Sequence, residues 1–258
     1  MSAAARVVAI LQARIGSTRL PGKVLLPAVG KPLIAHMIER VRRARRINEF
    51  WLATSASPEN ETLAQTVEAL GVSVFRGSEE DVLSRFADVA ARSRADVVVR
   101  LTGDCPLHDP AVIDEVIAHY LNADVDYVSN SLVPTYPDGL DVEVFSREVL
   151  DLAHRDAVNP VHREHVTPFI HRFHDAPGPF RVEHHAGPAD FSHLRWTVDE
   201  PADYAFVCRV FESLYPRNPD FGWLDVLALL TREPALLGQN SGVPRHKRYF
   251  EALRERLN

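Results

Sequence analysis

The amino-acid sequence predicts an α/β fold in which helices alternate with the strands of a mostly parallel sheet. Short apolar runs rich in β-branched residues recur through the first half of the chain, and stretches with helical periodicity lie between them. This alternation is typical of βαβ units. The composition, 46% hydrophobic and 25% charged, is that of a globular chain with a sizeable core. It excludes a disordered chain, a collagen-like repeat and a disulfide-stapled miniprotein.

The elements of the first half can be assigned in order. Strands are predicted at residues 7–11, 50–53, 72–75, 96–101 and 125–129. Helices are predicted between them at 33–45, 58–70, 81–92 and 110–121. Gly71 is a suitable stop for the second of these helices, and Asp109-Pro110 supplies the last one with an N-cap and a proline at the first helical position.

After Tyr127 the alternation becomes less regular. Further strands are predicted at 141–145, 180–184 and 193–198. Further helices are predicted at 147–155 and 160–172, from Pro201 onward, and at 245–257. The sequence contains no repeat, low-complexity tract or flexible linker, so we expect residues 1–258 to form one domain with an insertion at 130–195.

The charge of the chain is unevenly distributed. The net charge is −6, yet residues 1–46 contain ten basic residues and one acid, which gives this segment +9. The acidic total argues against a nucleic-acid partner, whereas the basic first sixth indicates an anionic ligand that docks near it. The arginines of 40–46 suit the last turns of a helix, so the cations left for a ligand are Arg14, Arg19 and Lys23.

Several other classes of protein are excluded. No apolar run approaches the ~18 residues that span a bilayer, and residues 1–14 do not look like a signal peptide. Cys105 and Cys208 form neither a disulfide framework nor a zinc motif. We therefore expect a cytoplasmic protein that binds neither membrane nor nucleic acid.

The segment 11–23 directly follows the first predicted strand and has the composition of a phosphate-binding loop. In open α/β sheets, ligands bind at the carboxyl ends of the strands. Gly16 permits close approach of the backbone, whose N–H groups can bind an anion. Hydroxyl groups and cations accompany it, with no acid among them: Ser17, Thr18, Arg14, Arg19 and Lys23. The segment matches neither GxGxxG nor GxxxxGK[ST], so we expect a polyphosphate site of another class, with a solvated basic loop as the alternative.

Two acidic turns are predicted to meet this loop. Asp104 follows the strand at 96–101, and Asp199 follows the apolar run at 193–198. Both carboxylates would emerge at the sheet edge where the basic loop lies. Because carboxylates beside a polyphosphate repel it unless a divalent cation lies between them, we predict that Asp104 and Asp199 share one Mg²⁺. The alternative is that these acids cap a loop and a helix.

Three motifs carry a resemblance to a known family. They are Gln-Ala-Arg-x-Gly-Ser-x-Arg-Leu-Pro-Gly-Lys at 12–23, Thr-Gly-Asp-x-Pro-Leu at 102–107 and Val-Asp-Glu-Pro-x-Asp at 198–203. Through them the chain resembles the cytidylyltransferases that make CMP-activated sugars, in particular the spore-coat polysaccharide branch related to CMP-Kdo and CMP-acylneuraminate synthetases. The match extends over residues 6–215, and the segments 76–85 and 136–143 look specific to that branch.

The resemblance implies a Rossmann-like, GT-A-type nucleotidyltransferase fold with CTP and Mg²⁺ as partners. It also implies a homodimer, with 130–195 used for acceptor binding and dimerisation. It assigns catalysis to Arg14, Lys23, Asp104 and Asp199, the two aspartates being the metal ligands. The nucleotide-binding residues that it implies are Leu11, Gln12, Ala13, Arg14, Gly16, Ser17, Arg19, Lys23, Ser78, Arg85, Thr102 and Asp104.

The acceptor site is predicted in two segments. The first is a loop and strand that could face the acceptor or form only an acidic turn, with Asp138, Asp141 and Glu143. The second is a helix that could bind an acidic or phosphorylated acceptor, or lie at the surface or a dimer contact, with His162, Arg163 and His165. The histidine spacing suggests no zinc site.

We therefore expect transfer of CMP from CTP to an acidic sugar of the nonulosonic-acid type, with release of pyrophosphate, for surface polysaccharide or glycoconjugate biosynthesis. Thr102 stands where the Kdo enzymes have glutamine, which argues against Kdo as the acceptor. One alternative is a cytidylyltransferase for a phosphorylated or phosphonate small molecule. Others are a GT-A glycosyltransferase that uses a sugar nucleotide, although the usual DxD motif is missing at 102–104, and a non-catalytic nucleotide-binding protein.

Overall fold

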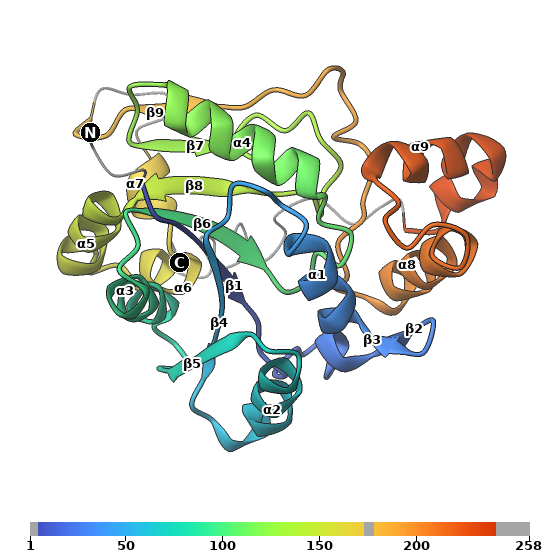
Figure 1. Ribbon diagram of the computed structural model, residues 1–258, viewed down its shortest axis with the longest axis horizontal. Helices are drawn as coiled ribbons and strands as arrows, with labels where there is room; N and C mark the ends of the chain where they lie inside the picture. The colour runs from blue at the N-terminus through green and yellow to red at the C-terminus, as the bar shows by residue number, and fades with distance from the viewer. Residues whose placement is uncertain (1–4, 173–177, 241–258) are drawn as a thin grey trace, which may run out of the picture.

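The computed structural model describes residues 5–172 and 178–240, and a seven-stranded sheet lies at its centre (Figure 1). The strands are β1 (Val7–Gln12), β4 (Glu49–Ser55), β5 (Ser73–Gly77), β6 (Val97–Thr102), β7 (Tyr127–Ser129), β8 (Glu143–Ser146) and β9 (Val182–His184). Their order is β5-β4-β1-β6-β8-β7-β9. The first four are parallel, and β8 is antiparallel to both of its neighbours. The prediction of a mostly parallel α/β sheet is confirmed.

Helices cover both faces of this sheet (Figure 1). On one face lie α1 (Leu33–Val41), α2 (Glu61–Ala69) and α4 (Pro110–Asn122), and on the other lie α3 (Val82–Ser93) and α5 (Arg147–Asp156). In β1, Val7, Ala9 and Leu11 pack on the first face, whereas Val8 and Ile10 pack on the second. Because both faces are covered, a continuous apolar run in the sequence indicates a central parallel strand.

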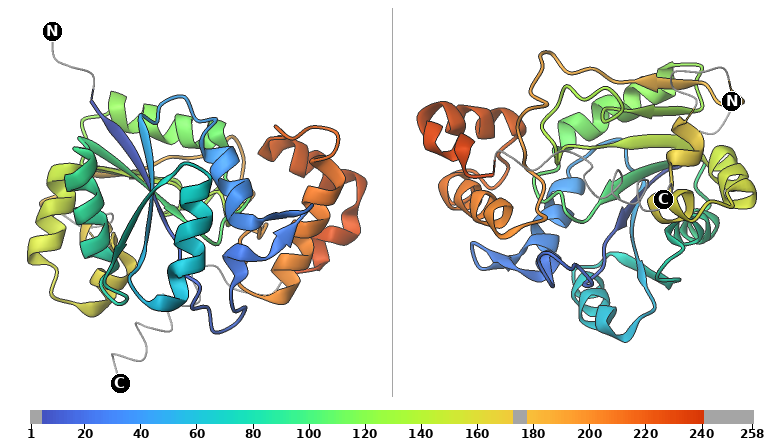
Figure 2. Two further views of the ribbon diagram at one scale, coloured as in Figure 1. Left: turned by 60° about the horizontal axis from the view of Figure 1, so that its bottom comes forward. Right: turned by 180° about the vertical axis from the view of Figure 1, so that it is seen from behind.

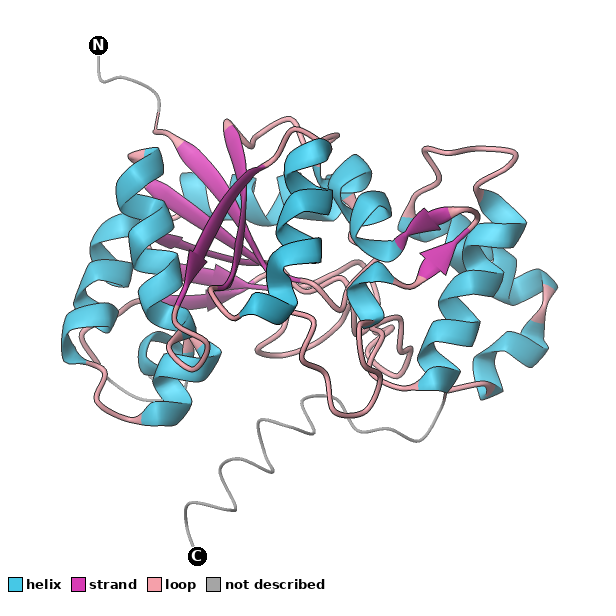
Figure 3. Cartoon of the chain, turned by 90° about the horizontal axis from the view of Figure 1, so that it is seen from below, coloured by secondary structure: helices cyan, strands magenta, loops and turns pink. Residues whose placement is uncertain are grey.

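A second group of elements gathers at one end of the sheet (Figures 2 and 3). It consists of α8 (Pro201–Leu214), α9 (Trp223–Arg232) and the hairpin of β2 (Pro27–Ala28) and β3 (Lys31–Pro32). The short 3₁₀ helices are η1 (Lys23–Leu25), η2 (Pro58–Asn60) and η3 (Pro234–Gly238). Tyr204 of α8 donates to the Pro27 carbonyl at 2.6 Å, so the C-terminal part holds the chain that follows the basic loop. None of the helices in the described ranges combines the length and the hydropathy needed to cross a membrane.

The prediction of one continuous helix at 160–172 is wrong. The structure has two short helices there, α6 (Pro160–His165) and α7 (Pro168–His171). Between them Val166 has φ 70° and ψ −61°, and the Thr167 N–H donates to the His165 carbonyl at 2.9 Å. This is a γ-turn, a strained conformation for a β-branched residue. Pro168 has no N–H to donate to a preceding helix, so a new helix begins at that residue.

The strand predicted at 193–198 is also wrong. This segment makes a single isolated bridge, between Arg195 and Asp138. Trp196 donates its N–H to the Asp138 carbonyl at 2.6 Å, and Val198 donates its own to the Asp104 carbonyl at 2.7 Å. Both partners are loops rather than strands. Trp196 and Val198 are buried and Leu194 is partly buried, so the apolar pattern indicated burial correctly although the segment forms no strand.

Two further predictions are not decided by this architecture. The helix predicted at 245–257 lies outside the described residues. The segment 130–195 contributes β8 and β9 to the sheet, and its use for acceptor binding and dimerisation stays a prediction.

Substitution of Gly139 tests the packing of the loops at the sheet edge. Its φ is +115°, and an added Cβ would lie 2.7 Å from both Trp196 C and Thr197 N. We expect Gly139→Ala to lower the free energy of unfolding by about 1–3 kcal/mol, measured by urea denaturation. The control is Gly238→Ala, where nothing lies within 4 Å of the added Cβ and the change should stay below about 0.5 kcal/mol. Equal stability of the two variants would contradict this packing.

Candidate active site

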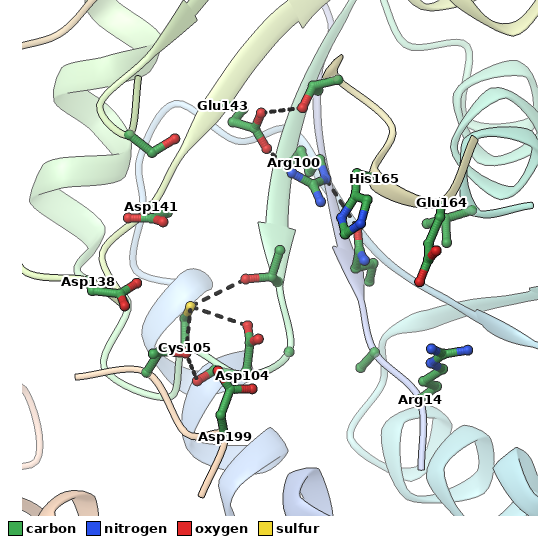
Figure 4. Close-up of a pocket in the computed structure, with 18 of the residues that line it drawn as sticks. Arg14, Arg100, Asp104, Cys105, Asp138, Asp141, Glu143, Glu164, His165 and Asp199 are labelled. Carbon is green, nitrogen blue, oxygen red and sulfur yellow. Dashed lines mark hydrogen bonds and ion pairs between the residues drawn. The ribbon is translucent and has the colours of Figure 1, made fainter. Parts of the chain in front are cut away.

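A cavity of about 440 Å³ opens beside the carboxyl ends of β1 and β6 (Figure 4). These two strands are neighbours, but the chain leaves β1 toward β4 and returns to β6 on the opposite side. The connections after the two strands therefore diverge, which leaves a crevice for a ligand. The basic loop after β1 and the turn after β6 both line this crevice.

Gly103 allows these two connections to touch. Its N–H donates to the Gln12 carbonyl at 2.8 Å, which extends the β1–β6 contact beyond the strands. An added Cβ would lie 2.6 Å from the Ala13 Cβ, so only glycine fits without displacement. This close approach brings the next residue, Asp104, beside the basic loop.

Lys23 lies between the two predicted metal ligands. Its Nζ is 2.9 Å from Asp199 Oδ1 and 3.6 Å from Asp104 Oδ2, and it donates to the Val198 carbonyl at 2.7 Å. Burial favours the neutral form of Asp104, but the Lys23 ammonium and hydrogen bonds from Thr102 and Cys105 outweigh it and lower the pKa of Asp104 to about 2. Asp104 is therefore ionised at neutral pH.

Asp199 is surrounded by cations. Its Oδ1 is 3.1 Å from the Arg19 guanidinium as well as 2.9 Å from Lys23, and its Oδ2 is 3.0 Å from Arg195. Arg19 also contacts Glu200 at 3.3 Å. The carboxylates of Asp104 and Asp199 therefore both lie beside the ammonium group of Lys23.

The pair of carboxylates fits Mg²⁺ as a donor set. Magnesium is commonly bound by one or two carboxylates together with water and phosphate oxygens. In the described ranges no three His, Cys, Asp or Glu side chains form a metal cluster on their own. Phosphate oxygens or water would therefore have to complete the coordination.

The remaining cation of the basic loop points toward the segment after β5. Arg14 is 2.6 Å from Glu79, whose backbone carbonyl accepts from the buried Arg85 at 3.1 Å. Arg85 also donates to the Ser78 carbonyl. Burial lowers the pKa of Arg85 to about 10. Arg85 therefore anchors residues 78–79 at the side of the cavity where Arg14 lies.

Glu143 is the centre of a buried polar network at the other end of the cavity. It forms an ion pair with Arg100 and accepts hydrogen bonds from Tyr127 at 2.5 Å and Thr167 at 2.6 Å. Burial favours the neutral acid, but Arg100 and these hydroxyl groups outweigh it and hold the pKa of Glu143 below its ordinary value. Arg100 in turn donates to the Gln12 side chain at 3.1 Å, which connects this network to the start of the basic loop.

Two walls face each other across this end. Figure 4 shows Glu164 and His165 on the side opposite Asp138 and Asp141. The γ-turn at Val166 places the side chains on either side of it, those of His165 and Thr167, along the cavity. The arrangement offers carboxylates, imidazoles and hydroxyl groups to a polar small molecule.

Comparison with known proteins decides the family. The family model described as Cytidylyltransferase matches residues 8–197 of this chain. The chain belongs to this family. It is a CTP-dependent nucleotidyltransferase. Spore coat polysaccharide biosynthesis protein SpsF of Bacillus subtilis is 35% identical over 237 residues, which cover 88% of this chain and 95% of that protein.

Solved structures agree with this assignment. A cytidylyltransferase from Leptospira borgpetersenii has a TM-score of 0.86 and 28% identity, covering 93% of this chain and 100% of its own. The structure of CMP:2-keto-3-deoxy-manno-octonic acid synthetase complexed with CTP has a TM-score of 0.60 and 23% identity, covering 81% and 99%, and shows the same fold. The prediction of a Rossmann-like nucleotidyltransferase fold is confirmed.

The cytidylyltransferase brings most of the predicted site residues to one cavity. Its lining includes Gln12, Ala13, Arg14, Gly16, Ser17, Arg19, Lys23, Arg85, Thr102, Asp104, Asp138, Asp141, Glu143, His165 and Asp199. Asp104 and Asp199 come together although the segment before Asp199 is not a strand. The individual roles assigned to these residues stay predictions.

Four predicted residues are not part of that lining. Leu11 is buried in the core beneath the loop. Ser78 is exposed and accepts from the Asp81 N–H at 3.1 Å. The ring of His162 packs against Phe169. Arg163 contacts Asp81 at 2.6 Å and donates to two carbonyls, which secures α6 to the start of α3.

Sequence reasoning missed two arginines of the cavity, Arg100 and Arg195. Each interrupts an apolar run, Val-Val-Val-Arg-Leu in β6 and Leu-Arg-Trp in 194–196. A charged residue inside such a run is buried only with a partner, so each was a signal for a buried ion pair. The acids that pair with these arginines are distant in the sequence and could not be identified from it.

We expect Lys23→Met to raise the pKa of the Asp104 carboxyl, because the ammonium is the main group that opposes the effect of burial. In the wild type, the depressed pKa stabilises the fold above the ordinary pKa of 3.8, and this contribution is lost as the pH falls toward 2. The difference in unfolding free energy between the wild type and Lys23→Met should therefore shrink from about pH 5 to about pH 2.

NMR titration of the aspartate Cγ signals, with urea denaturation at several pH values, checks this expectation. Lys31→Met is the control, since Lys31 is paired with Glu39 at the surface and should not affect Asp104. An Asp104 pKa that remains near 2 in Lys23→Met would show that another group ionises this carboxyl.

Proposed function

We propose that this cytidylyltransferase transfers CMP from CTP to an acidic sugar of the nonulosonic-acid type and releases pyrophosphate. The observation that carries the proposal is the contact of Lys23, in the basic loop, with both Asp104 and Asp199 at one end of the cavity. The other end of the same cavity is lined by polar side chains. The family relationship to SpsF, whose name places it in spore coat polysaccharide biosynthesis, supports a sugar acceptor.

In the proposed reaction a hydroxyl oxygen of the acceptor attacks the α-phosphorus of CTP. The bond from that phosphorus to the bridging oxygen breaks, pyrophosphate leaves, and the hydroxyl proton is released. Such chemistry requires positioning and stabilisation of negative charge more than covalent participation of the protein. Arg19 and Lys23 line the cavity and would bind the phosphates, whereas Arg14 lies against Glu79.

Asp104 and Asp199 are the residues that would hold Mg²⁺. The ion would supply charge neutralisation at the triphosphate. In the ligand-free chain Lys23 and Arg19 compensate these carboxylates. A bound triphosphate would offer both cations new anionic partners and leave the carboxylates to the metal.

The far end of the cavity suits an acidic, hydroxylated acceptor. His165 and His171 are groups that could bind a carboxylate, while Asp138, Asp141 and Ser131 could accept or exchange hydrogen bonds with hydroxyl groups. Arg100 is less suited to bind the acceptor directly because Glu143 neutralises it.

Measurement of pyrophosphate release over nucleotides and acceptors tests the proposal. We expect release only with CTP, and only when a nonulosonic acid such as N-acetylneuraminic acid is present. Release with CTP and a phosphonate or phosphorylated acceptor alone would assign the acceptor to that class instead. Consumption of a sugar nucleotide without pyrophosphate release would refute nucleotidyl transfer.

Nucleotide selectivity gives a second prediction. We expect CTP with Mg²⁺ to raise the melting temperature more than ATP or GTP with Mg²⁺, measured by differential scanning fluorimetry. A site built to hydrogen-bond one base leaves buried polar groups unpaired when another base binds. UTP is the most demanding comparison because it has the same ring size. Equal shifts with all four nucleotides would show that the base is not recognised.

A third prediction concerns the shared metal site. We expect Asp104→Asn and Asp199→Asn each to lower the Mg²⁺-dependent rate, and the double variant to be little worse than the worse single one, since residues that act as a unit are non-additive. Asp124→Asn is the control, because Asp124 is a surface acid with 93% side-chain exposure. Wild-type activity and an unchanged Mg²⁺ titration in Asp199→Asn would show that Asp199 has only a structural role and is not a metal ligand.

A further inference from the structure

Arg195 lies where the two ends of the cavity meet. Its side chain is only 8% exposed, and its guanidinium contacts three carboxylates. Nη1 is 2.9 Å from Asp138, and Nη2 is 3.0 Å from Asp199. Nε and Nη2 bind the two oxygens of Asp203 at 2.9 and 3.0 Å. One buried side chain therefore connects a residue predicted to bind acceptor with a residue predicted to bind metal.

Asp203 anchors this arginine to the start of α8. It is fully buried, and its Oδ2 accepts the backbone N–H groups of Asp199 and Glu200, each at 3.0 Å. Asn240 adds hydrogen bonds to Asp203 at 3.1 Å and to the Arg195 carbonyl at 2.9 Å. Asp203, at the N-terminus of α8, therefore holds the guanidinium in place, and these contacts form without a ligand.

The charge balance indicates more than a structural role. The two-point contact with Asp203 already balances the charge of this buried arginine, and it is the favoured geometry for such a pair. Asp138 and Asp199 add two further carboxylates to the same guanidinium, and Arg19 and Lys23 compensate the second oxygen of Asp199. Carboxylates taken out of water are destabilising unless cations compensate them. Both of these acids line the cavity, whereas Asp203 does not.

The two oxygens of Asp199 are used differently. Oδ2 contacts Arg195, whereas Oδ1 contacts Arg19 and Lys23. The first partner is held by α8, and the other two belong to the basic loop that would bind the triphosphate. Asp199 therefore has one oxygen fixed by the fold and one oxygen directed to the nucleotide end of the cavity.

We propose that Arg195 is a positioning residue. It orients Asp199 for the metal–nucleotide complex, and it holds Asp138, at the acceptor end of the cavity, at a fixed distance from Asp199. The inference rests on the proposed function, because it gives Arg195 a role in the same reaction. In this role Arg195 acts through the two aspartates that it contacts, Asp138 and Asp199.

Binding of Mn²⁺ tests this role without turnover. The affinity of Mn²⁺ is measured by electron paramagnetic resonance of the free ion, with CTP present and acceptor absent, and CTP binding in EDTA is measured by calorimetry. We expect Arg195→Lys to weaken Mn²⁺ binding by about 10–100-fold, as is typical for residues that orient metal ligands. Lysine keeps the charge but lacks the planar guanidinium that binds Asp203 at two points. CTP binding in EDTA should stay unchanged.

Arg40→Lys is the matched control. Arg40 is also buried, with 2% exposure, but it donates to the backbone carbonyls of His108 and Phe221 rather than to the carboxylates that Arg195 binds. It should lower the melting temperature as Arg195→Lys does and leave Mn²⁺ affinity unchanged. Asp203→Asn is a second variant in case Arg195→Lys does not fold, and it should weaken Mn²⁺ binding in the same direction by loosening the anchor.

The outcomes separate the possibilities. Wild-type Mn²⁺ affinity in a folded Arg195→Lys or Asp203→Asn variant, or an equal loss in Arg40→Lys, would overturn the positioning role. With the acceptor identified by pyrophosphate release, Arg195→Lys should also raise the KM for that acceptor, and an unchanged KM would remove the link through Asp138. A wild-type chain that binds no Mn²⁺ with CTP present would refute the proposed metal site itself, and the inference with it.

Discussion

The active site depends on charge compensation: the sheet topology brings acidic and basic side chains close together, and each charge needs a partner of the opposite sign. The switch from β1 to β6 brings Asp104 beside the basic loop, and the segment before α8 adds Asp199. Lys23 lies between these carboxylates, and Arg19 and Arg195 complete the balance. Removing Lys23 takes away the ammonium that opposes the effect of burial on Asp104. The loss of one partner of such a pair costs more than the intact pair contributes.

The same principle organises the far end of the cavity. Arg100 and Glu143 are buried on neighbouring strands and neutralise each other, with Tyr127 and Thr167 satisfying the remaining oxygen. Such pairs add little net stability, because the cost of desolvation offsets their attraction. What they supply is geometry: the cytidylyltransferase holds the walls of its cavity by directional contacts that apolar packing could not provide.

Close backbone contacts and one strained turn hold the loops around this cavity. Gly103 permits contact between the turn after β6 and the basic loop, and Gly139 lies directly against the backbone of Trp196 and Thr197. Val166 adopts a positive φ at the γ-turn between α6 and α7. Strained or tightly packed backbone persists only where the surrounding structure holds it in place, and such positions cluster at sites that bind and orient ligands.

The central strands, the helices that flank them and the composition of the basic loop were predictable from the sequence, since these features depend on residues close together along the chain. It also indicated Asp104 and Asp199 through their motifs, although it assigned a strand to 193–198. The folded chain was needed to reveal the antiparallel placement of β8, the break at Val166 and the partners of Arg100 and Arg195. The contact of Lys23 with Asp199 joins residues 176 positions apart. Local periodicity carries no information on such pairs, because folding selects them by burial and charge compensation across the whole chain.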